Sequence, residues 1–230
     1  MLCALSMLGW LSSAVWATLL NPVPAVYSCC TVVAAAGSAF WMHYAFLKWN
    51  ENRSGLSILN DPVFTLVPPY DTSELVAWCQ NVCFVVAVYH LLVTGALWWS
   101  WLAWCVFLFV CLRCISITLC PLHVHPTVRP LREPLAEYWA RCMGHNGRGY
   151  YYYHDLFFSG HTTVCCMLWL MMPPGWPKTV CGVHIMVMAA ALVVSRAHYS
   201  IDVFVAPFMA FWTVHAGAWT DAWCRAALGG

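Results

Sequence analysis

The sequence predicts an all-α, multi-pass membrane protein, and three observations support this prediction. First, 62% of the 230 residues are hydrophobic and only 8% are charged, against about 25% charged in a typical soluble domain. Second, several stretches of about 18 residues or more carry almost no charge, which is the length that a helix needs to cross a bilayer core of ~30 Å. Third, the apolar residues are continuous and do not alternate, which favours helices over a transmembrane barrel.

Six hydrophobic segments are expected to form one six-transmembrane-helix bundle. They cover residues 26–46, 74–94, 97–119, 156–172, 179–195 and 203–218. Pro22 and Pro24 break the chain before the first segment. Residues 1–24 are therefore a separate hydrophobic segment, either an extra helix or the start of a longer first one. It has no basic region, so it is not interpreted as a cleavable signal peptide. Residues 25–220 form the membrane domain, and residues 221–230 form a short tail.

The charge and the cysteines exclude some classes of function. A net charge of +1 gives no sign of nucleic-acid binding. Most of the 14 cysteines lie inside apolar segments, where a thiol behaves as a small hydrophobic side chain. Cys111 and Cys114 form a C-x-x-C pair, but no second pair lies at zinc spacing. We therefore predict neither a metal site nor a cofactor.

Polar residues gather at one end of the predicted bundle. Alternating spans place the connections 48–71 and 121–155 and the junction 195–202 on the same face of the membrane. Loops held together on one face of a rigid scaffold are the usual place for function. We expect the functional site on this face.

The first candidate motif is D-L-F-F-S-G-H-T at residues 155–162, where the longest connection enters the fourth segment. Ser159 and Gly160 suit a helix start, where free backbone N–H groups and the helix dipole favour an anion. His161 then stands at the membrane boundary, beside a potential phosphate site. The alternative interpretation is an interfacial histidine beside an ordinary helix cap.

The second candidate motif is S-R-A-H-Y-S-I-D at residues 195–202. If this stretch is helical, His198 and Asp202 lie on one face within hydrogen-bond reach. A carboxylate on one ring nitrogen fixes the tautomer and makes the other nitrogen a better nucleophile or base. Arg196 supplies a permanent planar charge matched to a phosphate. The alternative is an ion pair at a helix end that faces the headgroups, although ionisable residues in membranes are functional candidates by default.

Further candidates come from the third segment and from the loops. Arg113 lies inside an apolar segment, where a guanidinium is costly unless it pairs or lines a wet cavity. It is predicted to bind a phosphate or headgroup, or else to pair with a buried aspartate. Asp61 and Asp71 flank a Pro-rich turn and could position a headgroup, although aspartate is common in turns. Asp155 is a comparable candidate for binding the substrate.

Taken together, these motifs resemble the sphingomyelin synthase-like, C-terminal-type branch of the type 2 phosphatidic acid phosphatase (PAP2) superfamily. The resemblance rests on residues 155–162 and on H-Y-S-I-D-V at residues 198–203. It extends to R-C-I-S-I-T at residues 113–118, and to N-D-P and V-P-P-Y-D at residues 60–62 and 67–71. The motifs occur in the expected order with the expected spans between them.

The resemblance implies a PAP2-like bundle with a lipid-facing site and a two-step transfer. His198 would be the nucleophile that takes the phospho-headgroup, and Asp202 would orient and activate it. His161 would protonate the leaving diacylglycerol oxygen and then deprotonate the acceptor hydroxyl. Arg113 and Arg196 would stabilise charge. The implied partners are a phospholipid donor and a ceramide- or diacylglycerol-type acceptor in the membrane, and a homo-oligomer is compatible with the sequence.

Two alternatives and the orientation stay open at the level of sequence. The same residues would serve a PAP2-type lipid phosphatase or a phospholipase C-like hydrolase if water attacked the intermediate. A lipid-binding or transporter-like protein would use them without turnover. The Lys and Arg residues of the two long connections favour a cytoplasmic face. The resemblance implies an exoplasmic or lumenal site, and this is the orientation that we predict.

Overall fold

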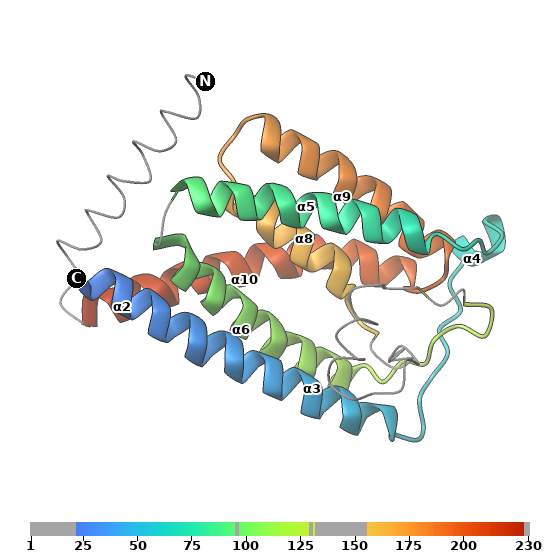
Figure 1. The fold of residues 1–230 in the computed structure, drawn as a ribbon. Coiled ribbons are helices and arrows are strands. Elements are labelled where there is room, and N and C mark those ends of the chain that lie inside the picture. The colour runs from blue at the N-terminus through green and yellow to red at the C-terminus, as the bar shows by residue number, and fades with distance from the viewer. Residues whose placement is uncertain (1–21, 95–96, 129–130, 132–155, 228–230) are drawn as a thin grey trace, which may run out of the picture.

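The computed structural model describes residues 22–94, 97–128, 131 and 156–227, and its regular elements there are helices (Figure 1). In chain order they are α2 (Pro22–Thr31), η1 (Val32–Ala36), α3 (Gly37–Glu51), α4 (Val63–Leu66), α5 (Ser73–Thr94), α6 (Leu97–Leu119), α8 (Gly160–Met171), α9 (Trp176–Val194) and α10 (Ser200–Ala227). The predicted N-terminal segment 1–24 lies outside the described residues except for its last three. Most of the connection 121–155 lies outside them as well.

Three of the described helices are long and apolar enough to cross a membrane. They are α9, α10 and residues Trp99–Leu119 of α6. At 1.5 Å per residue, the 19 residues of α9 extend for about 28 Å, close to the thickness of a bilayer core. The prediction of an all-α, multi-pass membrane protein is therefore confirmed at this level.

The first helix is longer than the predicted segment 26–46. α2, η1 and α3 follow one another without interruption from Pro22 to Glu51. Pro22 and Pro24 both lie within α2 and do not separate it from the first predicted segment. The five residues of η1 form a π-helical turn where this helix packs against α6.

α8 is shorter than the predicted segment 156–172. Its 12 residues extend for about 18 Å, which is too short for a full crossing. At its start, Phe157 and Phe158 have φ angles of 79° and 22°, which are incompatible with an α-helix. At its end, Met172 is extended because a proline follows it. The helix therefore begins inside the predicted segment, and its first turn is free to form a site.

α10 is longer than predicted and includes most of the expected tail. It runs for 28 residues to Ala227, beyond the expected end at residue 218. Nothing between Gly217 and Ala227 breaks a helix, and Arg225 Nε lies 2.8 Å from Asp221 Oδ2 one turn away. Residues 221–227 are thus the last turns of α10.

The short helix α8 occupies the centre of the bundle. It packs against α5, α9 and α10, and α10 also packs against α6, which in turn contacts α2, η1 and α3. Figure 1 shows α8 between α5 and α10, with α3 beside α6. Cysteines contribute to the apolar core as predicted, among them Cys83, Cys105, Cys165 and Cys181.

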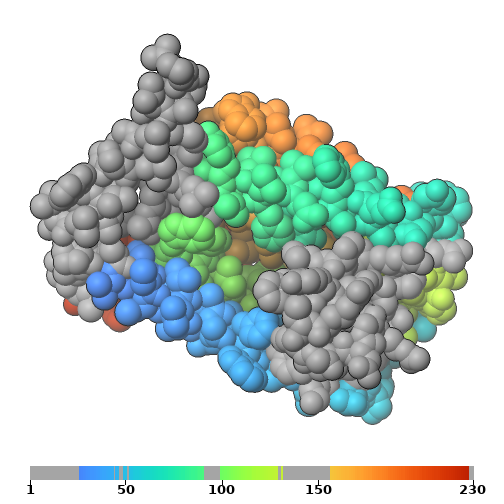
Figure 2. All heavy atoms as spheres, in the orientation of Figure 1, coloured from blue at the N-terminus to red at the C-terminus, as the bar shows by residue number. Residues whose placement is uncertain are grey.

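Large apolar side chains cover the outside of the bundle. Figure 2 shows α5 as a continuous outer surface on the face drawn. Among the side chains of α5, Trp78 is 64% exposed and Val85 is 68% exposed. On α10, Phe204, Phe208 and Trp212 are exposed in the same way. An exterior of this kind is stable against lipid and would aggregate in water.

The loops predicted to share one face are in contact with one another. The backbone N–H of Ser57 donates to the carbonyl of Pro121 at 3.0 Å, and that of His123 donates to the carbonyl of Ser57 at 2.8 Å. Tyr199 joins the third loop to both, because its hydroxyl donates to the carbonyl of His123 and accepts from the N–H of Leu59. The connections that were predicted to share one face of the membrane therefore contact one another.

Candidate active site

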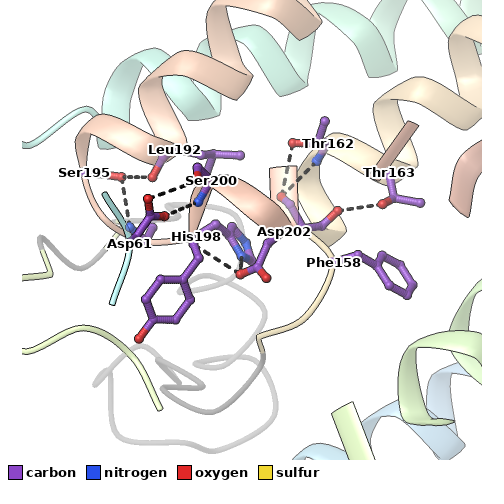
Figure 3. A network of polar contacts seen from close by, with 12 residues as sticks. Asp61, Phe158, Thr162, Thr163, Leu192, Ser195, His198, Ser200 and Asp202 are labelled. Carbon is purple, nitrogen blue, oxygen red and sulfur yellow. Dashed lines mark hydrogen bonds and ion pairs between the residues drawn. The ribbon is translucent and has the colours of Figure 1, made fainter. Parts of the chain in front are cut away.

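The junction between α9 and α10 carries His198 and Asp202. His198 stands in the turn before α10, and Asp202 lies in the first turn of that helix. Oδ2 of Asp202 accepts a hydrogen bond from the backbone N–H of Tyr199 at 3.2 Å. An acidic side chain that reaches back in this way stabilises a helix start. The same oxygen lies 3.5 Å from Nδ1 of His198, and the two side chains point toward each other (Figure 3).

This pairing differs in one respect from the sequence prediction, which placed both residues on one helical face. The helix begins after His198, so the reach of the Asp202 side chain around the helix start brings the two groups together. Among the described residues, neither Nδ1 of His198 nor Oδ1 of Asp202 has a hydrogen-bond partner. The pair is therefore free to shorten to a full hydrogen bond when a substrate binds.

The start of α8 is the second part of the site. Ser159 is the N-cap, and its hydroxyl accepts hydrogen bonds from the backbone N–H and the hydroxyl of Thr162. Its carbonyl accepts from the hydroxyl of Thr163 at 2.7 Å. Gly160 is the first residue of the helix and His161 the second. The predicted helix start at Ser159 and Gly160 is therefore present.

One backbone hydrogen bond joins the two motifs. The N–H of Ser159 donates to the carbonyl of Asp202 at 3.0 Å, which fixes the start of α8 against the first turn of α10. As a result, the rings of His161 and His198 lie with their centroids 5.9 Å apart, edge to face at 67°. One phosphate group can contact both rings at this separation.

Arg113 reaches the start of α8 from α6. Its side chain is buried, Nη1 donates to the carbonyl of Phe158, and Cζ lies 5.6 Å from the ring centroid of Phe158. Gly160 permits this approach, because a Cβ at that position would lie 3.2 Å from Cζ of Arg113. A guanidinium and the first N–H groups of α8 therefore lie side by side, and both favour an anion.

The site is largely removed from water. His198 is 5% exposed, and Asp202, Ser159 and Phe158 are 0% exposed. Burial lowers the pKa of His198 below its ordinary value of 6.5. The carboxylate of Asp202 raises this pKa, but its effect is smaller than that of burial. His161 and Arg113 also lower it, because they disfavour a second positive charge nearby. His198 is thus held neutral, the form in which an imidazole is a nucleophile.

Three other predicted residues make their contacts elsewhere. Arg196 donates to the carbonyls of Phe64 and Val67 and to the hydroxyl of Thr127. Asp61 accepts from the N–H and the hydroxyl of Ser200. Asp71 accepts from the N–H and the hydroxyl of Ser73 at the start of α5. Their role in binding substrate stays a prediction, and the predicted residue Asp155 lies outside the described residues.

The sequence analysis missed Tyr199 and Phe158 as structural parts of the site. Tyr199 is 1% exposed and stacks on Phe64 at 5.7 Å, and Phe158 presents its carbonyl to Arg113. Both are neighbours of motif residues, and a large aromatic residue next to a buried charge was the available signal. Over residues 22–94, 97–128, 131 and 156–227, no three His, Cys, Asp or Glu side chains gather as metal ligands would.

The comparison with protein families agrees with this geometry. Residues 154–218 match the family model described as PAP2 superfamily C-terminal. The matched residues contain His161, His198 and Asp202, together with α8, α9 and most of α10. A search of curated proteins finds no match.

Proposed function

From the premise that residues 154–218 are a C-terminal-type PAP2 domain, we propose that the chain is an integral membrane lipid phosphotransferase. It moves the phospho-headgroup of a phospholipid to a ceramide- or diacylglycerol-type hydroxyl. The observation that carries this proposal is the placement of His161 5.9 Å from His198, with Asp202 on the far nitrogen of His198. This is a nucleophile, its orienting carboxylate and a separate acid–base group around one small volume.

In the first half-reaction, Nε2 of His198 attacks the phosphorus of the donor. A P–N bond forms while the P–O bond to diacylglycerol breaks, and His161 gives its proton to the leaving oxygen. Asp202 holds Nδ1 of His198 and stabilises the charge that the ring acquires. The guanidinium of Arg113 and the first N–H groups of α8 are suited to the phosphate oxygens, whose charge rises in the transition state.

In the second half-reaction, His161 accepts the proton of the acceptor hydroxyl. The hydroxyl oxygen attacks phosphorus, the P–N bond breaks, and His198 leaves as a neutral imidazole. His161 loses one proton to diacylglycerol and regains one from the acceptor hydroxyl, so the site returns to its starting state and no external reagent is needed. The burial of His198 favours a lipid acceptor over water, because a lipid hydroxyl can enter this volume from the bilayer.

The proposal includes the arrangement in the membrane. The continuous helix from α2 to α3 and the helices α5, α6, α8, α9 and α10 correspond to the six helices of a PAP2-like bundle, with α8 as its short inner member. The loop face that carries His161 and His198 is exoplasmic or lumenal in this proposal. One of the arginines that oppose this orientation in a count of charges, Arg53, is committed to internal contacts with the carbonyls of Ile117 and Thr118.

A lipid phosphate-ester hydrolase is the second candidate. The PAP2 superfamily is one of phosphatases as well as phosphotransferases, and the same three residues serve both reactions. The difference lies only in the second half-reaction, in which water replaces the lipid hydroxyl.

Purified protein in liposomes separates the two candidates. The liposomes carry headgroup-labelled phosphatidylcholine, phosphatidylethanolamine or phosphatidylinositol, each with and without ceramide or diacylglycerol. A transferase moves label to the acceptor only when acceptor is present, and the His198→Ala variant moves none. Release of label into water, regardless of acceptor, would replace the transferase by the hydrolase. Turnover that survived His198→Ala would refute both.

A further inference from the structure

The loop before α5 lies along the junction that carries His198. The N–H of Tyr70 donates to the carbonyl of Val194, and the hydroxyl of Thr72 donates to the carbonyl of Ala191. These bonds attach the end of this loop to the last turn of α9. The segment 61–67, which includes α4, makes the remaining contacts and lies beside residues 196–200 on both sides of His198 in sequence.

Arg196 fastens this segment from the side before His198. One terminal nitrogen donates to the carbonyls of Phe64 at 2.7 Å and Val67 at 3.1 Å, and the guanidinium lies 5.2 Å from the Phe64 ring centroid. The other terminal nitrogen donates to the hydroxyl of Thr127 in the next loop. Arg196 adopts a left-handed backbone conformation with φ of 57°, a strained state that persists only where surrounding contacts hold it.

Asp61 fastens the same segment from the side after His198. Its side chain is 4% exposed, and its two oxygens accept from the N–H of Ser200 at 2.6 Å and from the hydroxyl of Ser200 at 3.0 Å (Figure 3). Oδ1 also accepts from the N–H of Val63 at 3.0 Å. Both carboxylate oxygens are therefore occupied by the start of α10 and by the segment itself.

We propose that the segment 61–67 is a clamp that positions His198, with Arg196 and Asp61 as its two fasteners. The clamp fixes the backbone two residues before and two residues after His198, so that the ring can only face Asp202 and His161. Tyr199 completes the clamp by stacking on Phe64 within it. The proposal rests on the proposed function, in which His198 is the nucleophile, and it assigns Arg196 and Asp61 as positioning residues and not as ligands of the phosphate.

The test measures His198 itself, without substrate. Diethyl pyrocarbonate modifies neutral, accessible histidines, and mass spectrometry of the peptide that contains His198 gives the rate at each pH and hence the pKa. The groups that face this ring are Asp202, His161 and Arg113, and all three stay unchanged in the variants. The variants are Arg196→Lys and Asp61→Asn, with Arg53→Lys as the matched control.

Each variant opens the clamp with little change of size; Arg196→Lys also keeps the charge, whereas Asp61→Asn removes one negative charge. A lysine cannot bond two carbonyls and stack on a ring as the planar guanidinium does. In Asp61→Asn, an amide NH₂ group replaces one carboxylate oxygen. This group is a donor and cannot accept the hydrogen bonds that the oxygen accepts. Arg53 is matched to Arg196, because it also donates to backbone carbonyls, those of Ile117 and Thr118, and lies 4.9 Å from an aromatic ring.

The clamp predicts that both variants admit water to His198. Modification of His198 then becomes several-fold faster, and its pKa rises toward the ordinary value. Loss of the negative charge of Asp61 by itself would lower the pKa of His198. A raised pKa in Asp61→Asn would therefore show that the His198 ring has lost its position. Arg53→Lys leaves both values as in the unmodified chain. In the transfer assay, kcat falls about tenfold in the two clamp variants while KM for the phospholipid stays within about twofold.

Unchanged titration of His198 in both variants would overturn the clamp. A raised KM with unchanged titration would assign Arg196 or Asp61 to the phosphate instead. The modification experiment needs no turnover, so it also separates the clamp from the proposed function. If His198→Ala retained activity while the titration shifted as expected, the clamp would stand and the catalytic role of His198 would fall.

Discussion

His198 and Asp202 use one helix start for two purposes. The carboxylate of Asp202 caps the N–H of Tyr199 and also lies 3.5 Å from Nδ1 of His198. A buried carboxylate that already serves the backbone cannot rotate away from the ring without leaving a buried donor unsatisfied, which costs about 1–3 kcal/mol. The geometry of this His–Asp pair is thus stabilised by the fold of α10.

The Asp202→Asn variant tests the role of the carboxylate charge beside His198. The amide keeps an oxygen for the N–H of Tyr199 but loses the charge that stabilises a positive His198 ring. We expect turnover to fall by about three orders of magnitude, with little change in the folded state. The measurement is the rate of headgroup transfer, with thermal unfolding of the same preparation as control. A loss of less than about fivefold would show that Asp202 is only a helix cap.

The lowered pKa of His198 predicts how the activity depends on pH. Because burial lowers the pKa of His198 below 6.5, the neutral nucleophile forms at lower pH than for an ordinary histidine. On the acidic side of its pH profile, the kcat/KM for the donor should therefore rise with pH and reach half its maximum below pH 6.5. In Asp202→Asn the half-maximum should move to still lower pH, because the carboxylate raises that pKa. A half-maximum above 6.5 that is due to His198 would contradict the burial observed here.

The sequence indicated His161, His198 and Asp202, which the structure brings together, better than it indicated the residues that support them. His161, His198 and Asp202 stand within short motifs whose spacing carries the chemistry. The partners of Arg196 could not be predicted in this way, since Phe64 lies 132 residues away and the contact depends on the positive φ of Arg196. From the sequence alone, the planar positive charge of Arg196 close to two histidines predicts that this residue binds a phosphate.

At the level of elements, the shortness of α8 defines the site. Because α8 begins at Gly160, its first N–H groups lie within the bundle, where Arg113 of α6 meets them. The sequence indicated a full span, because Leu156, Phe157 and Phe158 are as apolar as a helix interior. These apolar residues belong to the turn before α8, and hydropathy does not distinguish a buried turn from a helix.

The close approach of α6 and α10 predicts the effect of a substitution at Gly217. A Cβ at Gly217 would lie 2.5 Å from Sγ and 3.2 Å from the backbone nitrogen of Cys105, so α6 and α10 would have to separate. We expect Gly217→Ala to destabilise the protein by about 1–3 kcal/mol, measured by thermal unfolding in detergent. Gly37→Ala is the matched control, because nothing lies within 4 Å of a Cβ there. Equal stability of the two variants would mean that the helices do not approach this closely.

The whole molecule is a helical bundle whose two ends differ. One end carries His161 and His198, together with the hydrogen bonds that join residues 57–59, 121–123 and Tyr199. At the other end, Tyr27, Asp221 and Arg225 join α2 to α10, with the Tyr27 hydroxyl 3.0 Å from Oδ1 of Asp221. The fold class and the side of the bundle that carries the site followed from the sequence, because charge and hydropathy are distributed so unevenly. The helix ends did not, since caps and turns of positive φ decide them.

The proposed mechanism requires a covalent phosphoryl intermediate on His198. The direct measurement mixes the purified protein with a phospholipid whose phosphate is labelled, without acceptor, and stops the reaction in alkali, which preserves a phosphorus–nitrogen bond. Mass spectrometry then locates the label. We predict label on His198, its loss when ceramide or diacylglycerol is added, and none in His198→Gln. Full turnover with no label on His198, or with label on another residue, would contradict the mechanism.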